Sequence, residues 1–230
     1  MDVIELPDFF YDAARKLRPG LVVVFGRDNI AEFMFDLGLA LRRQGVVGDY
    51  FMSSKNAFET VHGRLFCGCS WEPEHAWRIS DSVLGKKKSC VEIGEISVLW
   101  DGVIPRRVSQ AQRNGNVGRT VVVNMDSALE DKTERWEAHA EAAIRNNVVL
   151  IEHSTMEEIG GKKILESSYP EIALLLSVAT GFDMAQKAVG VFSVAKTEGE
   201  CCIMDLKNEK GASFKYDGRR ERFMEVVDGK

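Results

Sequence analysis

A short apolar run, followed by a glycine turn and a helical pattern, constrains the fold of this chain more than any other feature. Leu21–Val24 reads as a buried strand, bounded upstream by a Pro-Gly pair. A turn around Gly26 follows, and apolar residues then recur at helical spacing from about Ile30 to Arg43. Strand, glycine turn and helix in this order are the context of a phosphate-binding loop. The sequence therefore predicts an α/β fold whose first helix begins where an anion could bind.

The loop itself lacks the side chains that bind a nucleotide. A phosphate-binding loop reads Gly-x-x-x-x-Gly-Lys-Ser/Thr, with the lysine on the phosphates and the hydroxyl on magnesium. Glu32 places a negative charge at the lysine position, and Phe33 has no oxygen for a metal. We therefore expect no cofactor here, neither ATP nor magnesium. The residues that could still contact an anion or nucleotide at this edge are Gly26, Arg27, Asn29, Ala31 and, from a later strand, Asp126.

Composition favours one large domain in a reducing, cytoplasmic environment. The chain has 230 residues, of which 45% are hydrophobic, enough to build a substantial core. No apolar run approaches the length of a membrane span, and the acidic N-terminus does not resemble a signal peptide. Five unevenly spaced cysteines argue against a disulfide framework. A net charge of -5 excludes a general attraction to nucleic acid.

Strands and helices alternate through the middle of the chain, and strands cluster at its end. Further strands are expected at residues 49–53, 96–100, 120–123, 148–151, 172–178, 189–195, 201–206 and 212–216. Further helices are expected at 6–17, 74–84 and 127–146, the last with Leu129, Trp136, Ala140 and Ile144 on one side. This pattern predicts a mainly parallel central sheet, flanked by helices and extended by C-terminal antiparallel strands. We expect a single domain, with an entry helix and linker at 1–19, an α/β core at 20–180 and a β-rich extension at 181–230.

Taken in order, these segments resemble the RecA-like ATPase core of the DnaB-type replicative helicases, in the RecA/DnaB/KaiC superfamily. The family loop A-G-R-P-S-M-G-K-T aligns without gaps with Phe25–Phe33, and Leu17–Leu21 is similar to the family entry G-L-R-P-G-D-L. Lys207–Gly211, Phe214–Gly218 and Arg222–Phe223 are similar to K-N-R-x-G, L-x-Y-D-G and R-F. The resemblance covers nearly the whole chain and implies a RecA-like, P-loop-type fold.

The resemblance also implies that the catalytic residues of the family are replaced. The phosphate-binding lysine aligns with Glu32 and the magnesium-binding hydroxyl with Phe33. The catalytic glutamate aligns at or beside Lys55, the Walker B aspartate with Asn124, and the nucleotide-sensing glutamine with His153. The arginine finger aligns with Glu209 or, in another register, with Glu198. Since phosphoryl transfer depends on cations around the γ-phosphate, we expect none of these positions to be catalytic.

The cysteines and histidines have a functional and a structural interpretation. His62, Cys67, Cys69 and His75 could hold zinc, but their spacing is not a usual structural zinc pattern, so packing in the core is favoured and no metal is expected. The adjacent Cys201 and Cys202 fall in a β-rich run, which predicts thiols on opposite sides of one strand.

Two polar groups leave alternatives open. His153 lies at the end of an apolar strand, and a hydrolase site with Asp126, Glu152 or Ser154 is conceivable; a structural polar residue is the favoured interpretation. Lys162 and Lys163 follow two glycines, where helicases of this type direct a loop at single-stranded DNA. No aromatic residue accompanies them, so a solvated loop is the alternative.

The sequence therefore favours a pseudo-ATPase, a degenerate RecA/DnaB-like domain that acts as a binding or regulatory protein in DNA replication or recombination. Its expected partner is a RecA-like or DnaB-like protein or further copies of itself, with single-stranded DNA as a second candidate and no membrane. The alternatives are a divergent DNA-dependent ATPase or helicase, and an accessory protein that binds single-stranded DNA without ATP.

Overall fold

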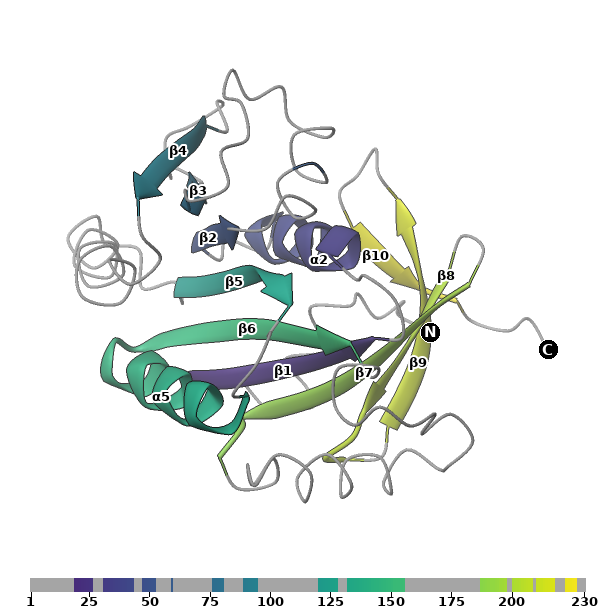
Figure 1. Ribbon diagram of the computed structural model, residues 1–230. Coiled ribbons are helices and arrows are strands. Elements are labelled where there is room, and N and C mark those ends of the chain that lie inside the picture. The colour runs from purple at the N-terminus through teal and green to yellow at the C-terminus, as the bar shows by residue number, and fades with distance from the viewer. Residues whose placement is uncertain are drawn as a thin grey trace.

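The computed structural model describes residues 19–26, 31–43, 47–52, 59, 76–80, 89–94, 120–127, 132–155, 187–197, 200–208, 210–217 and 222–226. These residues form a ten-stranded sheet with helices α2 (Ala31–Arg43) and α5 (Lys132–Arg145) packed on it (Figure 1). The strands are β1 (Gly20–Gly26), β2 (Val47–Met52), β3 (Ala76–Ser80), β4 (Ser89–Gly94), β5 (Thr120–Ser127), β6 (Val148–Thr155), β7 (Gly190–Thr197), β8 (Glu200–Asp205), β9 (Lys210–Asp217) and β10 (Arg222–Glu225).

The centre of the sheet is parallel and both of its flanks are antiparallel. The strand order is β10-β9-β8-β7-β1-β6-β5-β2-β3-β4. From β7 to β2 every neighbouring pair is parallel, whereas β8, β9 and β10 on one side and β3 and β4 on the other are antiparallel to their neighbours. This confirms the fold class predicted from the sequence, a mainly parallel α/β sheet with C-terminal antiparallel strands, which is the architecture that the resemblance to RecA-like cores implies.

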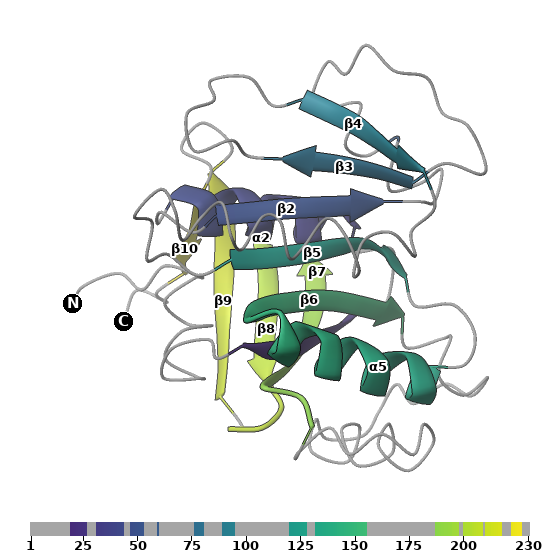
Figure 2. The same ribbon diagram turned by 90° about the vertical axis from the view of Figure 1, so that its left-hand side faces the viewer.

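Strand β1 is the centre of the core. Each residue from Leu21 to Phe25 has a relative exposure of 0%, as expected for a parallel strand covered on both faces. On one face Phe25 meets Trp136 of α5 in an edge-on arrangement, with ring centroids 6.0 Å apart. Helix α2 lies on the opposite face (Figure 2). The crossovers from β1 to β2 and from β5 to β6 run in opposite directions along the sheet, so right-handed connections place their helices on opposite sides.

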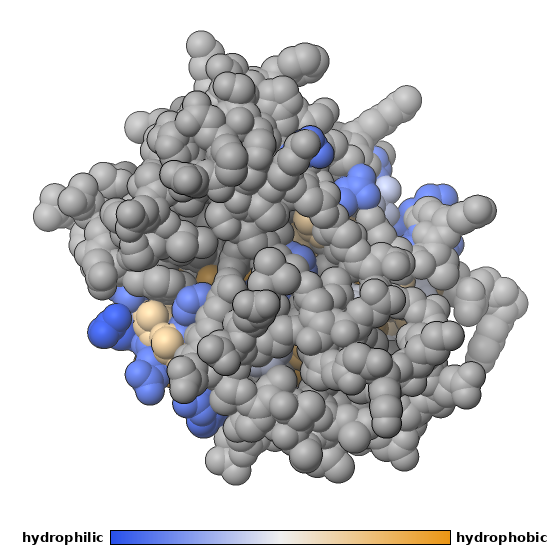
Figure 3. Space-filling model, in the orientation of Figure 1, coloured by the Kyte–Doolittle hydropathy of each residue, from blue (hydrophilic) through white to orange (hydrophobic). Residues whose placement is uncertain are grey.

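The outer face of α5 and the outer face of β8 are solvated. Over α5 the surface is hydrophilic around one small apolar area (Figure 3), and Ile144 is 59% exposed there. Along β8 exposed and buried residues alternate, so that Cys201 is buried and Cys202 exposed. This confirms that the two thiols lie on opposite sides of one strand. No helix in the described part of the chain is long and apolar enough to span a membrane.

Two sequence predictions are wrong. Residues 76–80 form strand β3 rather than part of a helix at 74–84; the run Ala-Trp-Arg-Ile-Ser alternates with period two and pairs with β2. Helix α5 begins at Lys132 rather than at residue 127, because β5 continues to Ser127. Its buried side includes Trp136, Ala140 and Ala143, and leaves out Ile144.

Some predicted elements cannot be compared with the structure. The entry helix at 6–17 and the strands at 96–100 and 172–178 lie outside the described residues.

Strands β4 and β10 were not predicted as strands. They have six and four residues.

Candidate functional site

The candidate site is the edge of the sheet at which the parallel strands end, which we call the carboxyl edge. Strand β1 ends there at Gly26, which is in register with Thr155 of β6 on one side and Val194 of β7 on the other. The chain leaves β1 towards β2, whereas the strand after β6 is β7, beyond β1. The ends of β1 and β6 therefore form a topological switch point, the place where open α/β sheets bind their ligands.

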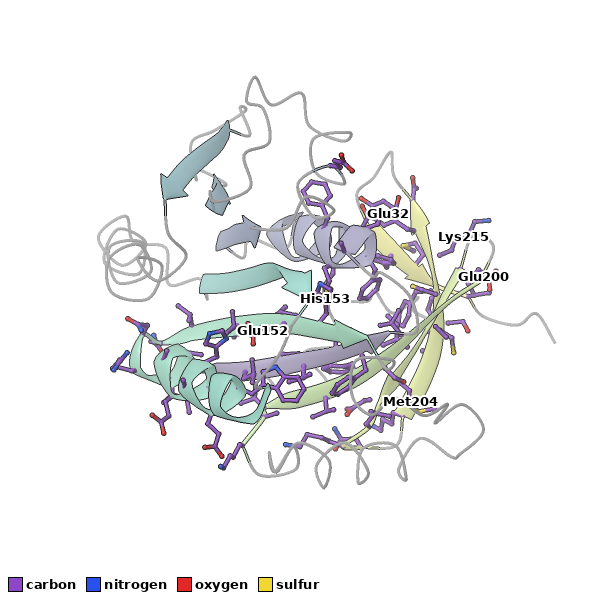
Figure 4. The ribbon with its side chains drawn as sticks, in the orientation of Figure 1. Glu32, Glu152, His153, Glu200, Met204 and Lys215 are labelled. Carbon is purple, nitrogen blue, oxygen red and sulfur yellow. The ribbon has the colours of Figure 1, made fainter. Side chains whose placement is uncertain are left out.

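Helix α2 begins at this edge, and its first residues have contrasting surroundings. Ala31 and Phe33 are buried, with exposures of 2% and 1%, whereas Glu32 between them is exposed. Glu32 lies in the first turn of the helix (Figure 4), where a carboxylate is stabilised by the positive end of the helix dipole. The helix start therefore already carries a negative charge of its own, which opposes the approach of a phosphate.

Phe33 belongs to an aromatic cluster that joins α2 to the C-terminal hairpin of β9 and β10. Its ring centroid lies 5.5 Å from that of Phe223 on β10, and Tyr216 of β9 lies 4.8 Å from Phe223. Phe223 is 3% exposed. Phe33, which the sequence analysis aligns with the magnesium-binding hydroxyl of a phosphate-binding loop, is thus a core residue.

Strand β5 is irregular where it reaches the carboxyl edge. Its pairing with β6 is regular as far as Val123–Ile151 and resumes at Ser127–His153. Three residues of β5, from Asn124 to Asp126, therefore stand opposite the single Glu152 of β6. Such bulges redirect side chains and are frequent beside functional sites. Asn124, which is in register with Phe51 of β2, and Asp126 both lie in this irregular segment.

Glu152 and His153 point to opposite faces of the sheet. Glu152 is 1% exposed and lies beneath α5, whereas His153 is 2% exposed and lies on the side of α2 (Figure 4). His153 is paired with Val24, two residues before the end of β6, so it is inside the sheet rather than at the strand end. This arrangement excludes direct cooperation of Glu152 with His153, and with it a hydrolase site built on these two residues.

Glu152 is paired with a residue that the sequence analysis did not single out. His139 Nδ1 of α5 lies 2.8 Å from Glu152 Oε1, a hydrogen bond in which the imidazole N–H donates to the carboxylate. The side chain of His139 is 19% exposed. The signal in the sequence was a glutamate directly after the apolar run Val148–Ile151 of β6, but the sequence did not show which residue would meet it.

The turn between β8 and β9 is built around a buried carboxylate. Asp205 is 1% exposed and accepts hydrogen bonds from Lys207 N (2.9 Å), Asn208 N (3.3 Å) and Asn208 Nδ2 (2.5 Å). Lys207 Nζ donates to the carbonyl oxygen of Ala188 (2.7 Å), which fixes the turn to the start of β7. The ammonium group of Lys207 is therefore hydrogen-bonded to the backbone of the same chain.

The remaining predicted site residues lie outside the described residues, and their roles stay predictions. They are Arg27, Asn29, Lys55, Glu198, Glu209, the loop lysines Lys162 and Lys163, and the group His62, Cys67, Cys69 and His75. Within the described ranges, no group of three or more His, Cys, Asp or Glu side chains could hold a metal ion.

No known protein family and no curated protein matches the chain in sequence. Among solved structures it is similar to the RadB recombinase, with a TM-score of 0.49 and 13% identity over 95% of this chain and 96% of that one. It is also similar to the flagellar accessory protein FlaH from Methanocaldococcus jannaschii, with a TM-score of 0.45 and 9% identity over 98% of this chain and 100% of that one. Likeness of this degree does not bear on what this chain binds or does.

Proposed function

We propose that this chain is a catalytically degenerate RecA-like domain that acts as a binding or regulatory protein in DNA replication or recombination. The observation that carries the proposal is the environment of two side chains in the first turn of α2, Glu32 and Phe33. The strand, the turn position and the helix of a phosphate-binding loop are present, but Phe33 is buried in the core and Glu32 complements the helix dipole. Both side chains serve the fold at positions where a nucleotide would need a cation and a hydroxyl.

A domain without nucleotide chemistry can still act through its surfaces. RecA-like domains that form rings assemble by heterologous contacts, in which one face of a subunit meets a different face of the next. A degenerate copy can therefore dock on one face of a working RecA-like or DnaB-like ATPase, or on another copy of itself. In that position it would load, cap or inhibit its partner.

The first test is calorimetric titration of the purified protein with Mg·ATP and with a non-hydrolysable analogue. We expect no binding heat at high micromolar nucleotide, and no phosphate release with or without single-stranded DNA. An ATPase of known affinity, measured in the same buffer, is the positive control. Saturable binding of either nucleotide would overturn the proposal.

A divergent ATPase is the second candidate, and the irregular end of β5 is the observation that favours it. Asp126 lies two residues beyond Asn124 in this segment and would supply the carboxylate that Asn124 cannot. If this candidate is correct, Mg·ATP binds and Asp126→Asn abolishes binding, whereas Asp217→Asn on β9 leaves it unchanged. Binding that survives Asp126→Asn would exclude this role for Asp126.

A further inference from the structure

Strand β10 is attached to the rest of the protein in two ways. Along one edge its four residues pair with β9. Through one face it packs on α2, where the aromatic cluster of Phe33, Tyr216 and Phe223 forms the contact. β10 is the edge strand of the sheet and has only β9 as a strand neighbour, over four residues, so the apolar contact with α2 is its second attachment.

We propose that the aromatic cluster is an internal closure of the carboxyl edge, in which Phe33 holds the C-terminal hairpin of β9 and β10 on the first turn of α2. Phe33 is aligned with the hydroxyl position of a phosphate-binding loop and directs its ring to Phe223. The exposures of 1% for Phe33 and 3% for Phe223 show that the two rings exclude water from this contact. The hairpin is thus held by packing that needs no ligand. This inference rests on the proposed function, because it takes the loop to be degenerate.

The closure predicts that a change at the start of α2 alters the local stability of β10. Shortening Phe33 should loosen β10 and the part of β9 paired with it, and should leave β1 and β6 comparatively protected. An aromatic pair contributes about 0.5–1.5 kcal/mol beyond its burial, so local opening should become up to about tenfold more frequent.

Hydrogen exchange of the full chain, followed by mass spectrometry, tests this coupling. The variants are Phe33→Leu and Phe223→Leu, and the matched control is Phe35→Leu, an equally buried residue of the same helix outside the cluster. Peptides covering β1 report global unfolding, and the measured quantity is the exchange rate of the β9–β10 peptides relative to β1. We expect this ratio to rise by roughly two- to tenfold in both cluster variants and to stay at the wild-type value in the control.

An unchanged ratio in Phe33→Leu would overturn the closure, and so would an equal rise in Phe35→Leu. The exchange experiment uses no nucleotide, whereas the calorimetric test of the proposed function uses the wild-type protein. A failure of the closure and a failure of the proposed function are therefore seen separately.

Discussion

Glu32 and Phe33 are neighbours in the first turn of α2, but they stabilise the protein through different interactions. The exposed carboxylate of Glu32 lies at the positive end of the helix dipole. The ring of Phe33 is buried against β10. Neither effect would be available to a lysine and a hydroxyl residue at these positions, so both side chains stabilise the fold as they stand.

Replacing Glu32 with lysine tests this interpretation at its charged position. Glu32→Lys reverses a favourable interaction with the helix dipole, and we expect unfolding by urea to show a loss of about 0.3–1 kcal/mol. We also expect no gain of Mg·ATP binding by calorimetry, because Phe33 still fills the hydroxyl position. Glu32→Gln should lose less stability than Glu32→Lys. Micromolar nucleotide binding by Glu32→Lys would show that charge alone had blocked the site.

A second residue-scale feature is the carboxylate of Glu152, which lies within a central parallel strand. Such strands are usually apolar throughout, and a buried carboxylate is costly unless it is hydrogen-bonded. His139 of α5 supplies a hydrogen bond of 2.8 Å. The pair therefore ties helix α5 to β6 through a polar contact inside an apolar layer.

Removing His139 should cost more stability than its partial exposure suggests. His139→Ala takes a hydrogen bond from a carboxylate that is 1% exposed, and we expect a loss of about 1–3 kcal/mol in urea unfolding. Glu141→Ala, at an exposed position of the same helix, should change stability by less than about 0.5 kcal/mol. Equal losses in the two variants would show that the pair contributes nothing specific.

At the scale of elements, the largest buried side chain of α5 is Trp136. Trp136 is 0% exposed and meets Phe25 of β1, whereas Ile144, two turns later, is 59% exposed. We expect Trp136→Ala to lose about 3–5 kcal/mol, because it leaves a cavity against the central strand. Ile144→Ala should stay within about 0.5 kcal/mol of the wild type. Thermal and urea unfolding followed by circular dichroism measure both, and a large loss in Ile144→Ala would mean that the helix packs on its other face.

The helices and central strands follow from local patterns, whereas the flanking strands depend on partners elsewhere in the chain. Leu21–Val24 is apolar throughout, and the helix beginning near Ile30 is amphipathic, so both were predictable. Residues 76–80 lie in a segment whose local pattern also suits a helix, and their pairing with β2 decides for a strand. Which side of α5 is buried depends on its packing against the sheet, and this packing covers Trp136, Ala140 and Ala143 and leaves Ile144 exposed.

The contacts of the candidate site were not predictable from the sequence. The sequence shows only that Glu32 and Phe33 stand where a phosphate-binding loop would have a lysine and a hydroxyl residue. It does not show that Phe33 meets Phe223, because the two residues are far apart in the sequence. The irregular end of β5 is likewise invisible in the sequence, since it exists only relative to β6.

At the scale of the whole molecule, the described strands form a continuous hydrogen-bonded sheet from β10 to β4. A single sheet with the apolar β1 at its centre leads us to expect one cooperative unfolding unit, and the single domain expected from the sequence stays a prediction. We expect urea-induced transitions followed by tryptophan fluorescence and by far-ultraviolet circular dichroism to coincide. Two separated transitions would divide the chain into units that unfold independently.

The position of β1 also has a consequence for how the protein is made. Val22 is in register with Ile151 of β6 and Gly190 of β7, so the most apolar strand is translated long before either neighbour. At a synthesis rate of about 5–20 residues per second, it waits on the order of ten seconds for its partners. During that interval the nascent chain displays an unpaired strand that can associate with other chains. The yield of soluble protein should therefore depend on chaperone supply at the ribosome, and it should rise when translation before β6 is fast.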